Sequence, residues 1–473
     1  MIKNHEADID KVITLDLVDF LNDDLGNYAF YKVLTQIPHI LDGLTITQRK
    51  IIHVMSKNKD KTFKTAQTYS YLLNDTKYVH GDVSVYNTTN NMAALYKNNI
   101  NLLTPKSNFG NRTIPSASAP RYTESKYSKI AQLIFNNIDS NLLIPQIFEN
   151  EEIEPYYLLP SLPLGLINGN SGIAMGYKAD IFPRNPLEIL NTLRSILRKE
   201  TKRIDNFMVP WIPYFNGVIE KTDCPKKWIF KGIIEKVRST KNYGFLRITE
   251  IPFKSRDRYV EKNINGLIDT GVIKSWDDAC EKNQFLFDIK VPIEIYEKPH
   301  DELLELFGLV VTKVESLTFI NRDDISIELK EYDSIANFFK DWISMRASFY
   351  KKRKEFILSK LEKDLMIAQN RAKFIKDIID DNIIIKKRKK SVIEKDLGKL
   401  EYVSIDDSYD YLLNMSIWNL TSEKISELNK KIRNIKLEIK RVNELNPIDI
   451  WLDDLDNLEE LIIKEIDTKT LKS

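Results

Sequence analysis

The sequence predicts an α+β protein of several domains, and three observations support this fold class. The chain has 473 residues, and about 150 residues per domain gives an expectation of about three domains. Its middle part alternates apolar and polar residues between prolines and glycines, which is typical of strands. Residues from Phe338 to Ile379 contain neither proline nor glycine and repeat apolar side chains every three to four positions, which predicts a long helix.

The N-terminal third divides into an arm and a basic domain. Residues 1–25 are acidic and loosely patterned, so we expect an N-terminal arm that meets another chain. Residues 26–145 form the next domain, in which the segment from Lys126 to Ile138 has helical spacing. From Gly26 to Ser140 there are 14 Lys and Arg against 6 Asp and Glu, although the whole chain carries a formal net charge of only +2. This excess favours contact with phosphate, while ordinary variation of charge along a soluble chain remains the alternative.

The middle domain is expected at residues 146–332. Prolines recur throughout it, and the run from Tyr243 to Ile251 alternates as a strand does. Its basic stretches, residues 194–203 and 226–231, either support DNA or are solvated faces.

The C-terminal third predicts a pair of helices followed by a tail. Apolar residues in the second helix alternate in steps of three and four, as in a coiled-coil seam: Ile425, Leu428, Ile432, Ile435, Ile439 and Val442. We therefore expect an antiparallel coiled coil over residues 333–446, with a small knob at about residues 381–420. Pro447 ends the second helix, and residues 447–473 are expected to be an acidic C-terminal tail.

Composition excludes several classes of protein. Cys224 and Cys280 provide neither a disulfide framework nor a Cys-x-x-Cys zinc pattern. The first residues lack a basic-then-apolar signal, and no apolar run approaches the roughly 18 residues that a membrane span requires. The expectation is a soluble, intracellular chain that does not contact a membrane.

The segment most indicative of chemistry is SASAPRYTESKYSKI, residues 116–130. Small residues end abruptly at Arg121 and Tyr122. The arginine offers a planar, charged fork suited to phosphate, and the tyrosine hydroxyl could act as a nucleophile. An Arg-Tyr pair alone is a weak signal and equally fits an ordinary, half-buried tyrosine.

This segment resembles the active-site stretch of type IIA DNA topoisomerases, and further segments match that family in the same order. They are LDGLTITQRKII at 41–52, HGDVSVY at 80–86, NFGN at 108–111 and LINGNSGIAMG at 166–176. The chain thus resembles the DNA-cleaving, A-type subunit over about residues 25–445. Three shorter segments narrow the resemblance to the medium subunit of the topoisomerase of T4-like phages: 248–253, 276–280 and 339–342 with Arg346.

The resemblance implies both a fold and a site. Residues 26–145 would be a winged-helix domain, 146–332 a tower domain, and the helical knob the dimerising exit gate (C-gate). Tyr122 would break the DNA backbone and stay joined to its 5′ phosphate, while Arg121 stabilises the charge on the phosphoryl group. The remaining implied contacts are phosphate binding by Arg49, Lys50, Lys77, His80 and Ser171, and insertion of Ile173 between base pairs. For Ile173, packing in a glycine-flanked turn is the alternative reading.

The sequence departs from the family pattern at two places near this site. The first histidine of the family's HPHGD stretch is Tyr78 here, and its proline is Val79. The acidic residues between the NFG motif and the Arg-Tyr pair are replaced by Arg112-Thr113-Ile114-Pro115.

Cofactors and partners follow from the resemblance and from what the sequence lacks. It contains neither a P-loop nor the Glu…Asp-x-Asp cluster that carries Mg²⁺ in this family. Mg²⁺ and ATP are therefore expected on ATPase and metal-binding partner subunits. A homodimer would cut both strands of one duplex and pass a second through the break, in the cytoplasm of an infected bacterial host. Because no β-pinwheel follows, relaxation of supercoils is expected rather than their introduction.

Three other readings remain open. The chain could belong to a cellular topoisomerase IV or an archaeal type IIB-like enzyme. It could also be a non-catalytic, dimeric, DNA-binding architectural protein, or a scaffold that does not bind DNA.

Overall fold

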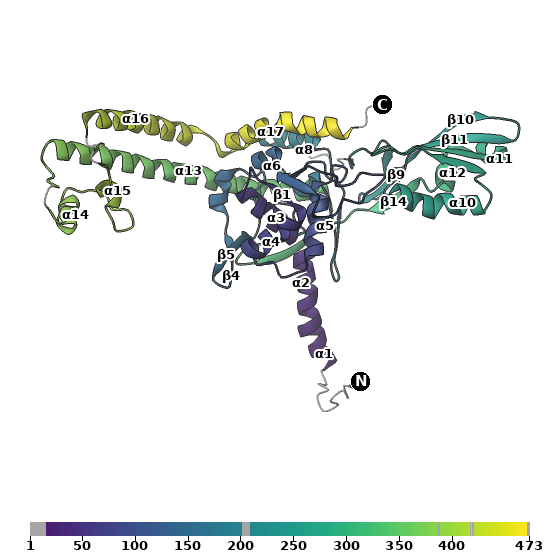
Figure 1. The fold of residues 1–473 in the computed structure, drawn as a ribbon, viewed down its shortest axis with the longest axis horizontal. Coiled ribbons are helices and arrows are strands. Elements are labelled where there is room, and N and C mark those ends of the chain that lie inside the picture. The colour runs from purple at the N-terminus through teal and green to yellow at the C-terminus, as the bar shows by residue number, and fades with distance from the viewer. Residues whose placement is uncertain (1–15, 201–208, 386–387, 417, 419–420, 471–473) are drawn as a thin grey trace. The chain divides into compact units, whose positions relative to one another are not determined.

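The computed structural model describes residues 16–200, 209–385, 388–416, 418 and 421–470 (Figure 1). These residues form two compact units. The first comprises the described residues up to 346 together with those from 452 onward, and the second comprises Ala347–Trp451. Both helices and strands are present, as the α+β prediction requires. None of the described helices is long and apolar enough to cross a membrane.

The chain enters the first unit through a helix with little burial. Its elements are α1 (Leu17–Asp19), the π-helical turn η2 (Phe20–Leu25) and α2 (Gly26–Gln36). None of their residues is buried, and several large apolar side chains are exposed, among them Leu17, Val18, Phe20, Tyr28 and Phe30. The arm expected at residues 1–25 is therefore helical from Leu17, and residues 1–15 lie outside the described part.

Three helices and a small sheet follow. The elements are α3 (Ile46–Lys57), α4 (Thr65–Thr76), α5 (Asp82–Ala93) and an antiparallel sheet of order β1-β3-β2, with β1 (Thr62–Lys64), β2 (Leu103–Pro105) and β3 (Glu124–Tyr127). Ile51, Leu72 and Val85, one from each helix, are fully buried. Phe63 lies opposite Ser125 in the sheet. Because β3 follows Tyr122 and pairs with β1, which directly precedes α4, the Arg-Tyr segment ends beside the start of α4.

The helix expected from Lys126 to Ile138 is shorter than predicted. Residues 124–127 pair with β1 and β2 as a strand, and α6 occupies only Lys129–Ile134, before the 3₁₀ turn η3 (Asn137–Leu142). The Ser128 hydroxyl accepts a hydrogen bond from the Ala131 N–H at 3.0 Å, which is the N-cap that starts α6. Strand pairing thus overrides the helical spacing of the first residues.

Hairpins and short helices make up the next part of this unit. They are β4 (Pro145–Phe148) with β5 (Glu151–Pro155), α7 (Leu164–Ile167), β6 (Asn170–Ile173) with β7 (Lys178–Ile181), α8 (Pro186–Leu197), the sheet β14-β9-β8 of β8 (Val218–Lys221), β9 (Lys227–Lys231) and β14 (Val310–Val314), and β15 (Leu317–Arg322) with β16 (Ile327–Tyr332). The Asn185 side chain accepts from the N–H groups of Leu187 and Glu188 and caps α8.

A four-stranded antiparallel sheet of order β10-β11-β13-β12 is the largest sheet among the described residues. Its strands are β10 (Ile233–Ser239), β11 (Tyr243–Glu250), β12 (Ser275–Asp278) and β13 (Phe287–Pro292). The strand predicted from the alternation at 243–251 is confirmed, and its buried positions, Leu246 and Ile248, lie in a core with Phe287 and Ile289. Short helical segments accompany this sheet (Figure 1): α9 (Arg256–Tyr259), η4 (Val260–Ile264), α10 (Asn265–Asp269), α11 (Ile293–Tyr296) and α12 (His300–Leu306).

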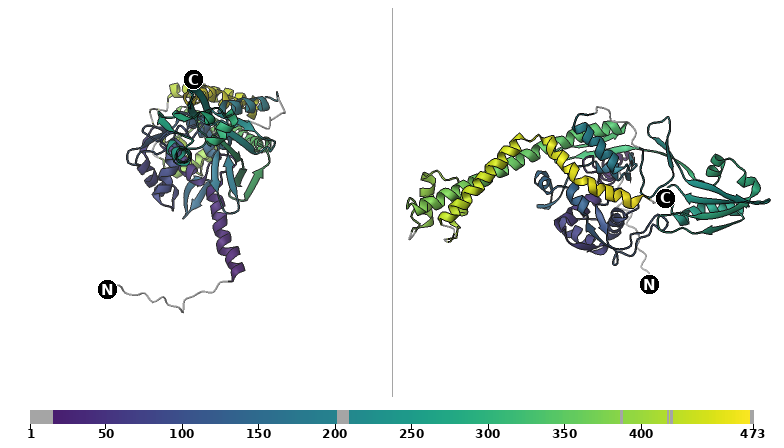
Figure 2. Two further views of the ribbon diagram at one scale, coloured as in Figure 1. Left: turned by 90° about the vertical axis from the view of Figure 1, so that its right-hand side faces the viewer. Right: turned by 90° about the horizontal axis from the view of Figure 1, so that it is seen from above.

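The second unit is built on two long helices. Helix α13 (Ile335–Ile379) continues from the first unit, and α16 is Ser422–Glu444. The Lys354 ammonium donates to the Asn443 and Leu445 carbonyls, whereas Ala372 and Ile375 pack with Leu428. The two helices therefore run antiparallel (Figures 1 and 2). The connector contains α14 (Lys390–Lys399) and α15 (Asp410–Leu413). Its buried residues form a core with Phe374 of α13: Ile383, Ile393, Leu397, Tyr402 and Leu412.

The segment expected to be an acidic tail is a packed helix, α17 (Pro447–Lys469). Leu455, Leu458 and Ile462 lie on one stripe at helical spacing and are fully buried. The acidic residues occupy the other faces, where Asp456 and Glu459 pair with Arg194 of α8. The two helices lie side by side (Figure 1). The prediction was wrong because net charge says nothing about whether one face of a helix is apolar.

Substituting Leu458 by Ala is expected to lower the free energy of unfolding by about 2–5 kcal/mol, because it leaves a cavity under α17. Ile463→Ala, five residues further along the same helix, is the control: its side chain is exposed, and a change within about 0.5 kcal/mol is expected. Urea unfolding of both variants measures the difference, and equal losses would contradict a packed α17.

Candidate active site

Tyr122 lies at the end of a turn that is held by the start of α4. The Tyr122 N–H donates to the Ala119 carbonyl at 2.8 Å, and the Ala66 N–H donates to the Pro120 carbonyl at 3.0 Å. The Thr123 hydroxyl bonds to that of Thr65 at 2.7 Å, deep in the protein. Backbone N–H groups at the beginning of a helix have no partner within the helix, so the loop carbonyls satisfy them. The turn is thereby attached to a rigid element.

The Tyr122 side chain faces solvent, with 68% of its surface exposed. The exposed Arg121 guanidinium lies 5.4 Å from the centre of the Tyr122 ring. This arrangement excludes the half-buried tyrosine of the alternative reading. An exposed phenol next to a permanent positive charge can reach an anionic, extended ligand such as a phosphodiester backbone.

A separate cleft of about 480 Å³ brings together three other predicted residues, Lys50, Lys77 and His80. The exposed His80 bonds to the Tyr31 hydroxyl of α2 through its Nε2 atom, and its ring lies edge-on to the buried Tyr78. Tyr78, which stands where the family has a histidine, is thus a support for the His80 ring rather than a solvent-facing ligand.

Lys50 is buried and paired, in contrast to the expected free phosphate ligand. Its ammonium lies 2.7 Å from the Glu154 carboxylate and donates to the Thr76 carbonyl at 2.7 Å. Burial lowers the pKa of Lys50 and raises the pKa of Glu154, and the attraction within the pair opposes both shifts. Lys77 also has a partner, since its ammonium lies 2.7 Å from the more exposed Glu151 carboxylate.

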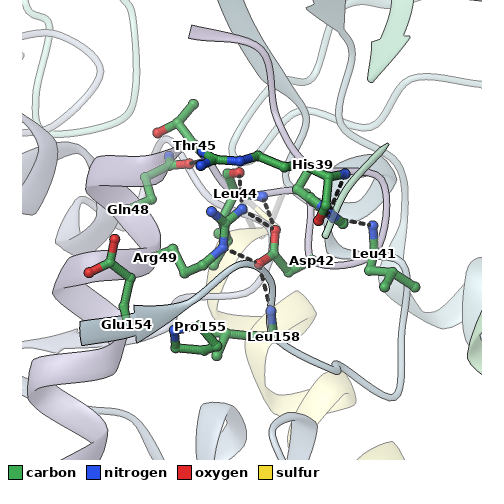
Figure 3. Close-up of polar contacts among 12 residues, drawn as sticks. His39, Leu41, Asp42, Leu44, Thr45, Gln48, Arg49, Glu154, Pro155 and Leu158 are labelled. Carbon is green, nitrogen blue, oxygen red and sulfur yellow. Dashed lines mark hydrogen bonds and ion pairs between the residues drawn. The ribbon is translucent and has the colours of Figure 1, made fainter. Parts of the chain in front are cut away.

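Arg49, predicted as a phosphate ligand, is buried in an ion pair within the protein. Its guanidinium is buried and donates to the Asp42 carboxylate at 2.7 and 3.1 Å and to the Leu44 carbonyl at 3.0 Å (Figure 3). Asp42 also accepts from the Leu158 N–H at 2.9 Å. Arg49 therefore ties α3 to two loops, and its guanidinium is occupied by acceptors of the protein itself. The Arg-Lys pair of the motif could not reveal this, because helix position alone does not say which residue points inward.

Glycine is required beside this network. Gly43 has a φ of +66°, and a Cβ there would lie 2.2 Å from the Gly165 backbone nitrogen. Two backbones therefore touch at this point, which only glycine permits.

Ser171 and Ile173 lie on the β6–β7 hairpin. Both are exposed, Ile173 to 75%, so the packing alternative for Ile173 is wrong. A Cβ on Gly172 between them would lie 2.1 Å from the Gln36 carbonyl oxygen, so this glycine lets the hairpin rest against the end of α2. Among the described side chains, no hydrogen bond or ion pair joins Tyr122 to the cleft residues or to this hairpin.

His39, beside the same network, predicts a pH dependence of stability. Its Nδ1 accepts from the Leu41 N–H at 3.1 Å, and burial lowers its pKa from 6.5 to about 4. Between pH 6.5 and 4 the unfolded chain binds a proton that the folded chain does not, so His39 stabilises fully above pH 6.5 and loses its contribution as pH falls toward 4. The loss is on the order of 3 kcal/mol.

Urea unfolding at pH 7 and pH 5 tests this expectation. His39→Gln should flatten the pH dependence, whereas His300→Gln, at an exposed position, should leave it unchanged. His53, whose pKa burial also lowers to about 4, remains in both variants and keeps part of the slope. An unaltered slope in His39→Gln would contradict the assignment.

Sequence reasoning missed Tyr31, Glu154 and Asp42, which hold the predicted residues in place. Asp42 lies within the LDGLTITQRKII motif. The Asp-Gly-Leu turn before α3 was the signal that could have indicated its buried pair with Arg49. Tyr31 and Glu154 carried no local signal.

Comparison with known proteins settles the family. A family model for the A-type subunit of DNA gyrase/topoisomerase IV matches residues 36–456. The chain belongs to this family. Among the relatives of this chain, the "DNA topoisomerase medium subunit" of Enterobacteria phage T4 is 29% identical, over 94% of this chain and 99% of the phage protein. The "DNA topoisomerase 2, mitochondrial" of Dictyostelium discoideum is 30% identical over 96% of this chain.

This chain spans about a third of the length of the topoisomerase 2 relatives from Dictyostelium discoideum and Plasmodium falciparum, 36% and 34% respectively. A solved structure titled as the Plasmodium falciparum topoisomerase II DNA-binding, cleavage and re-ligation domain superimposes with a TM-score of 0.83 at 29% identity. The match covers 96% of this chain and 65% of that one.

Proposed function

We propose that this chain is the DNA-breaking and rejoining subunit of an ATP-dependent type II DNA topoisomerase of a T4-like phage. The observation that carries the proposal is the exposed Tyr122 with the Arg121 guanidinium beside it, in a member of the A-type family of gyrase and topoisomerase IV. The phage assignment is supported by the near-complete coverage of the T4 medium subunit.

In the proposed reaction, the Tyr122 phenol oxygen attacks a DNA phosphorus. A new oxygen–phosphorus bond forms, the bond from phosphorus to the 3′ oxygen breaks, and that oxygen leaves with a proton as a hydroxyl. The 5′ phosphate stays on Tyr122 as an ester of similar energy, so attack by the 3′ hydroxyl restores the strand. A phenol is a weak nucleophile at neutral pH, and the positive charge of Arg121 stabilises the negative charge that develops on the phosphoryl oxygens.

The remaining predicted residues would hold the duplex. His80 is exposed, lines the cleft and is the most accessible phosphate ligand there, because Lys50 and Lys77 are already paired with Glu154 and Glu151. Ile173 is exposed at the edge of a hairpin, where an apolar wedge can enter a base step at a cost of a few kcal/mol that wrapping of the DNA repays. The α3–α5 helices with the β1-β3-β2 sheet would act as the winged helix, and the β10-β11-β13-β12 sheet as the tower.

In this proposal Mg²⁺ and ATP bind to other subunits, and a second copy of this chain completes the complex. Among the described residues, no three His, Cys, Asp or Glu side chains come together in a way that could hold a metal ion. Mg²⁺ and ATP would be bound by partner subunits. Two copies of this chain would join through the α14–α15 knob, and the complex would act in the cytoplasm of an infected bacterium.

Covalent trapping tests the proposed function. The chain is mixed with its ATPase and metal-binding partner subunits, Mg²⁺, ATP and supercoiled plasmid, and the reaction is stopped with detergent. Protein-linked double-strand breaks together with relaxed plasmid are expected. Salt-sensitive DNA binding with neither product would instead favour the architectural reading, and loss of DNA binding altogether would favour the scaffold.

A further inference from the structure

The loop that carries Tyr122 has little packing of its own. From Gly110 to Tyr122, all of which the structure describes, Thr113 is the only buried residue. The segment from Ser116 to Ala119 consists of small residues that place no large side chain in a core. The position of the loop therefore depends on a few polar contacts, which lie at its two ends and at Pro115, whose carbonyl accepts from the Tyr96 hydroxyl at 3.1 Å.

One end is the attachment to α4 described above, and the other is the four-stranded sheet. The Thr113 N–H donates to the Lys282 carbonyl at 3.1 Å, and the Arg112 N–H donates to the Asn283 side chain at 3.0 Å. Both acceptors belong to the turn between β12 and β13. Contacts separated by about 170 positions thus fix the start of the loop to this sheet.

The Arg112 side chain provides the strongest of these contacts. Its guanidinium donates to both carboxylate oxygens of Glu250, at 3.0 and 2.5 Å, and to the Tyr214 carbonyl. It also lies 4.9 Å from the centre of the Phe285 ring. The Arg112 and Glu250 side chains are only 10% and 1% exposed, so their pairing is little screened by water. Glu250 is the last residue of β11 and is itself held by the Asn216 N–H at 3.0 Å.

A series of hydrogen bonds within and beside the loop connects Arg112 to Tyr122. The Asn111 side chain accepts from the Ile114 N–H at 2.8 Å, which closes the turn after Arg112. The Ser118 N–H then donates to the Asn108 carbonyl at 3.1 Å, and the Tyr122 N–H donates to Ala119. Gly110, with a φ of +81°, allows the backbone to pass within contact of Pro115.

We propose that Arg112 is a positioning residue for strand breakage: by binding Glu250 it fixes the Tyr122 loop to the four-stranded sheet. This inference rests on the proposed function. In-line attack on phosphorus needs the phenol oxygen within a few tenths of an ångström of its reactive position, and a displacement of about 1 Å can cost about 100-fold in rate. The attachment to α4 holds the Tyr122 end of this loop, and the Arg112–Glu250 pair holds its other end.

The test separates DNA binding from the cleavage step. Arg112→Met keeps the length and the contact with Phe285 but removes the charged fork, and Arg112→Lys keeps the charge without the fork. We expect the Kd for a 30-base-pair duplex to stay within about twofold of wild type, while the cleavage rate at saturating DNA falls about 10- to 100-fold for Met. Arg112→Lys should be intermediate. Both are measured in the complete complex, per folded protein.

Arg247→Met is the matched control. Arg247 lies on β11, three residues before Glu250, and pairs with Asp288 on the surface, where the two side chains are 40% and 42% exposed. The Arg247→Met variant should cleave DNA at the wild-type rate. Cleavage at the wild-type rate by Arg112→Met, or an equal loss in Arg247→Met, would overturn the proposal.

Hydrogen exchange of the isolated chain keeps the two proposals distinguishable. The amide groups of residues 114–123 should exchange faster in Arg112→Met than in wild type or Arg247→Met, whether or not the DNA is cut. Unchanged exchange would overturn the positioning role. Absence of any Tyr122-dependent adduct in wild type, with faster exchange in Arg112→Met, would instead refute the proposed function and leave the anchoring of the loop established.

Discussion

Replacing Tyr122 by Phe is expected to abolish the covalent DNA adduct while leaving DNA affinity nearly unchanged. The substitution removes one hydroxyl from a side chain that is 68% exposed and makes no side-chain hydrogen bond among the described residues. The free energy of unfolding should therefore not change. Without the attacking oxygen, the phosphotyrosyl ester cannot form. The loss should be at least about 10⁴-fold, since removal of a nucleophile eliminates the step itself.

Tyr243→Phe is the control for this experiment. Tyr243 is also exposed, lies on the four-stranded sheet and should trap DNA as wild type does. An adduct that persists in Tyr122→Phe would assign the attack to another residue. Adducts missing from wild type as well, with salt-sensitive binding retained, would support the architectural reading.

Substituting Asp42 by Asn should produce the largest loss of stability. Asp42 accepts from the Arg49 guanidinium and from the Leu44 and Leu158 N–H groups, and both charged side chains are buried (Figure 3). A neutral amide leaves the Arg49 charge without compensation in an environment that water does not reach. Breaking such a pair from one side costs about 3–5 kcal/mol.

Urea unfolding measures this loss, and Asp288→Asn provides the comparison. Asp288 pairs with Arg247 in similar bidentate geometry but on the surface, so its loss should cost at most about 1 kcal/mol. A cost below about 1 kcal/mol for Asp42→Asn would contradict the structural role given to Arg49 and reopen the possibility that it binds phosphate.

Elements with a strong local pattern could be predicted. Proline-free apolar periodicity indicated α13, the three-four alternation indicated α16, and the alternation at Tyr243 indicated β11. Each pattern reflects the geometry of one element, in which side chains three or four apart, or two apart, share a face. The helix expected from Lys126 to Ile138 was only partly right: α6 occupies Lys129–Ile134, but pairing with β1 and β2 makes Lys126 and Tyr127 part of a strand.

The candidate site was predicted only in part, for a related reason. The motif order identified Tyr122, Arg121, His80 and Ile173, and the structure exposes all four. The motif order did not show that Arg49 is buried against Asp42 instead of exposed, because burial depends on which face of α3 meets the rest of the protein.

By itself, the sequence determined the family, the order of its motifs, the tyrosine and arginine of the proposed chemistry, and the long helices. These depend on residue identity and short-range spacing. Only the tertiary structure decided that Arg49 is a structural ion pair, that residues 447–469 are a packed helix, and that Arg112 reaches Glu250. Charges and loops acquire such roles from partners more than a hundred positions away or from a buried face, and no local pattern records which distant group will arrive beside them.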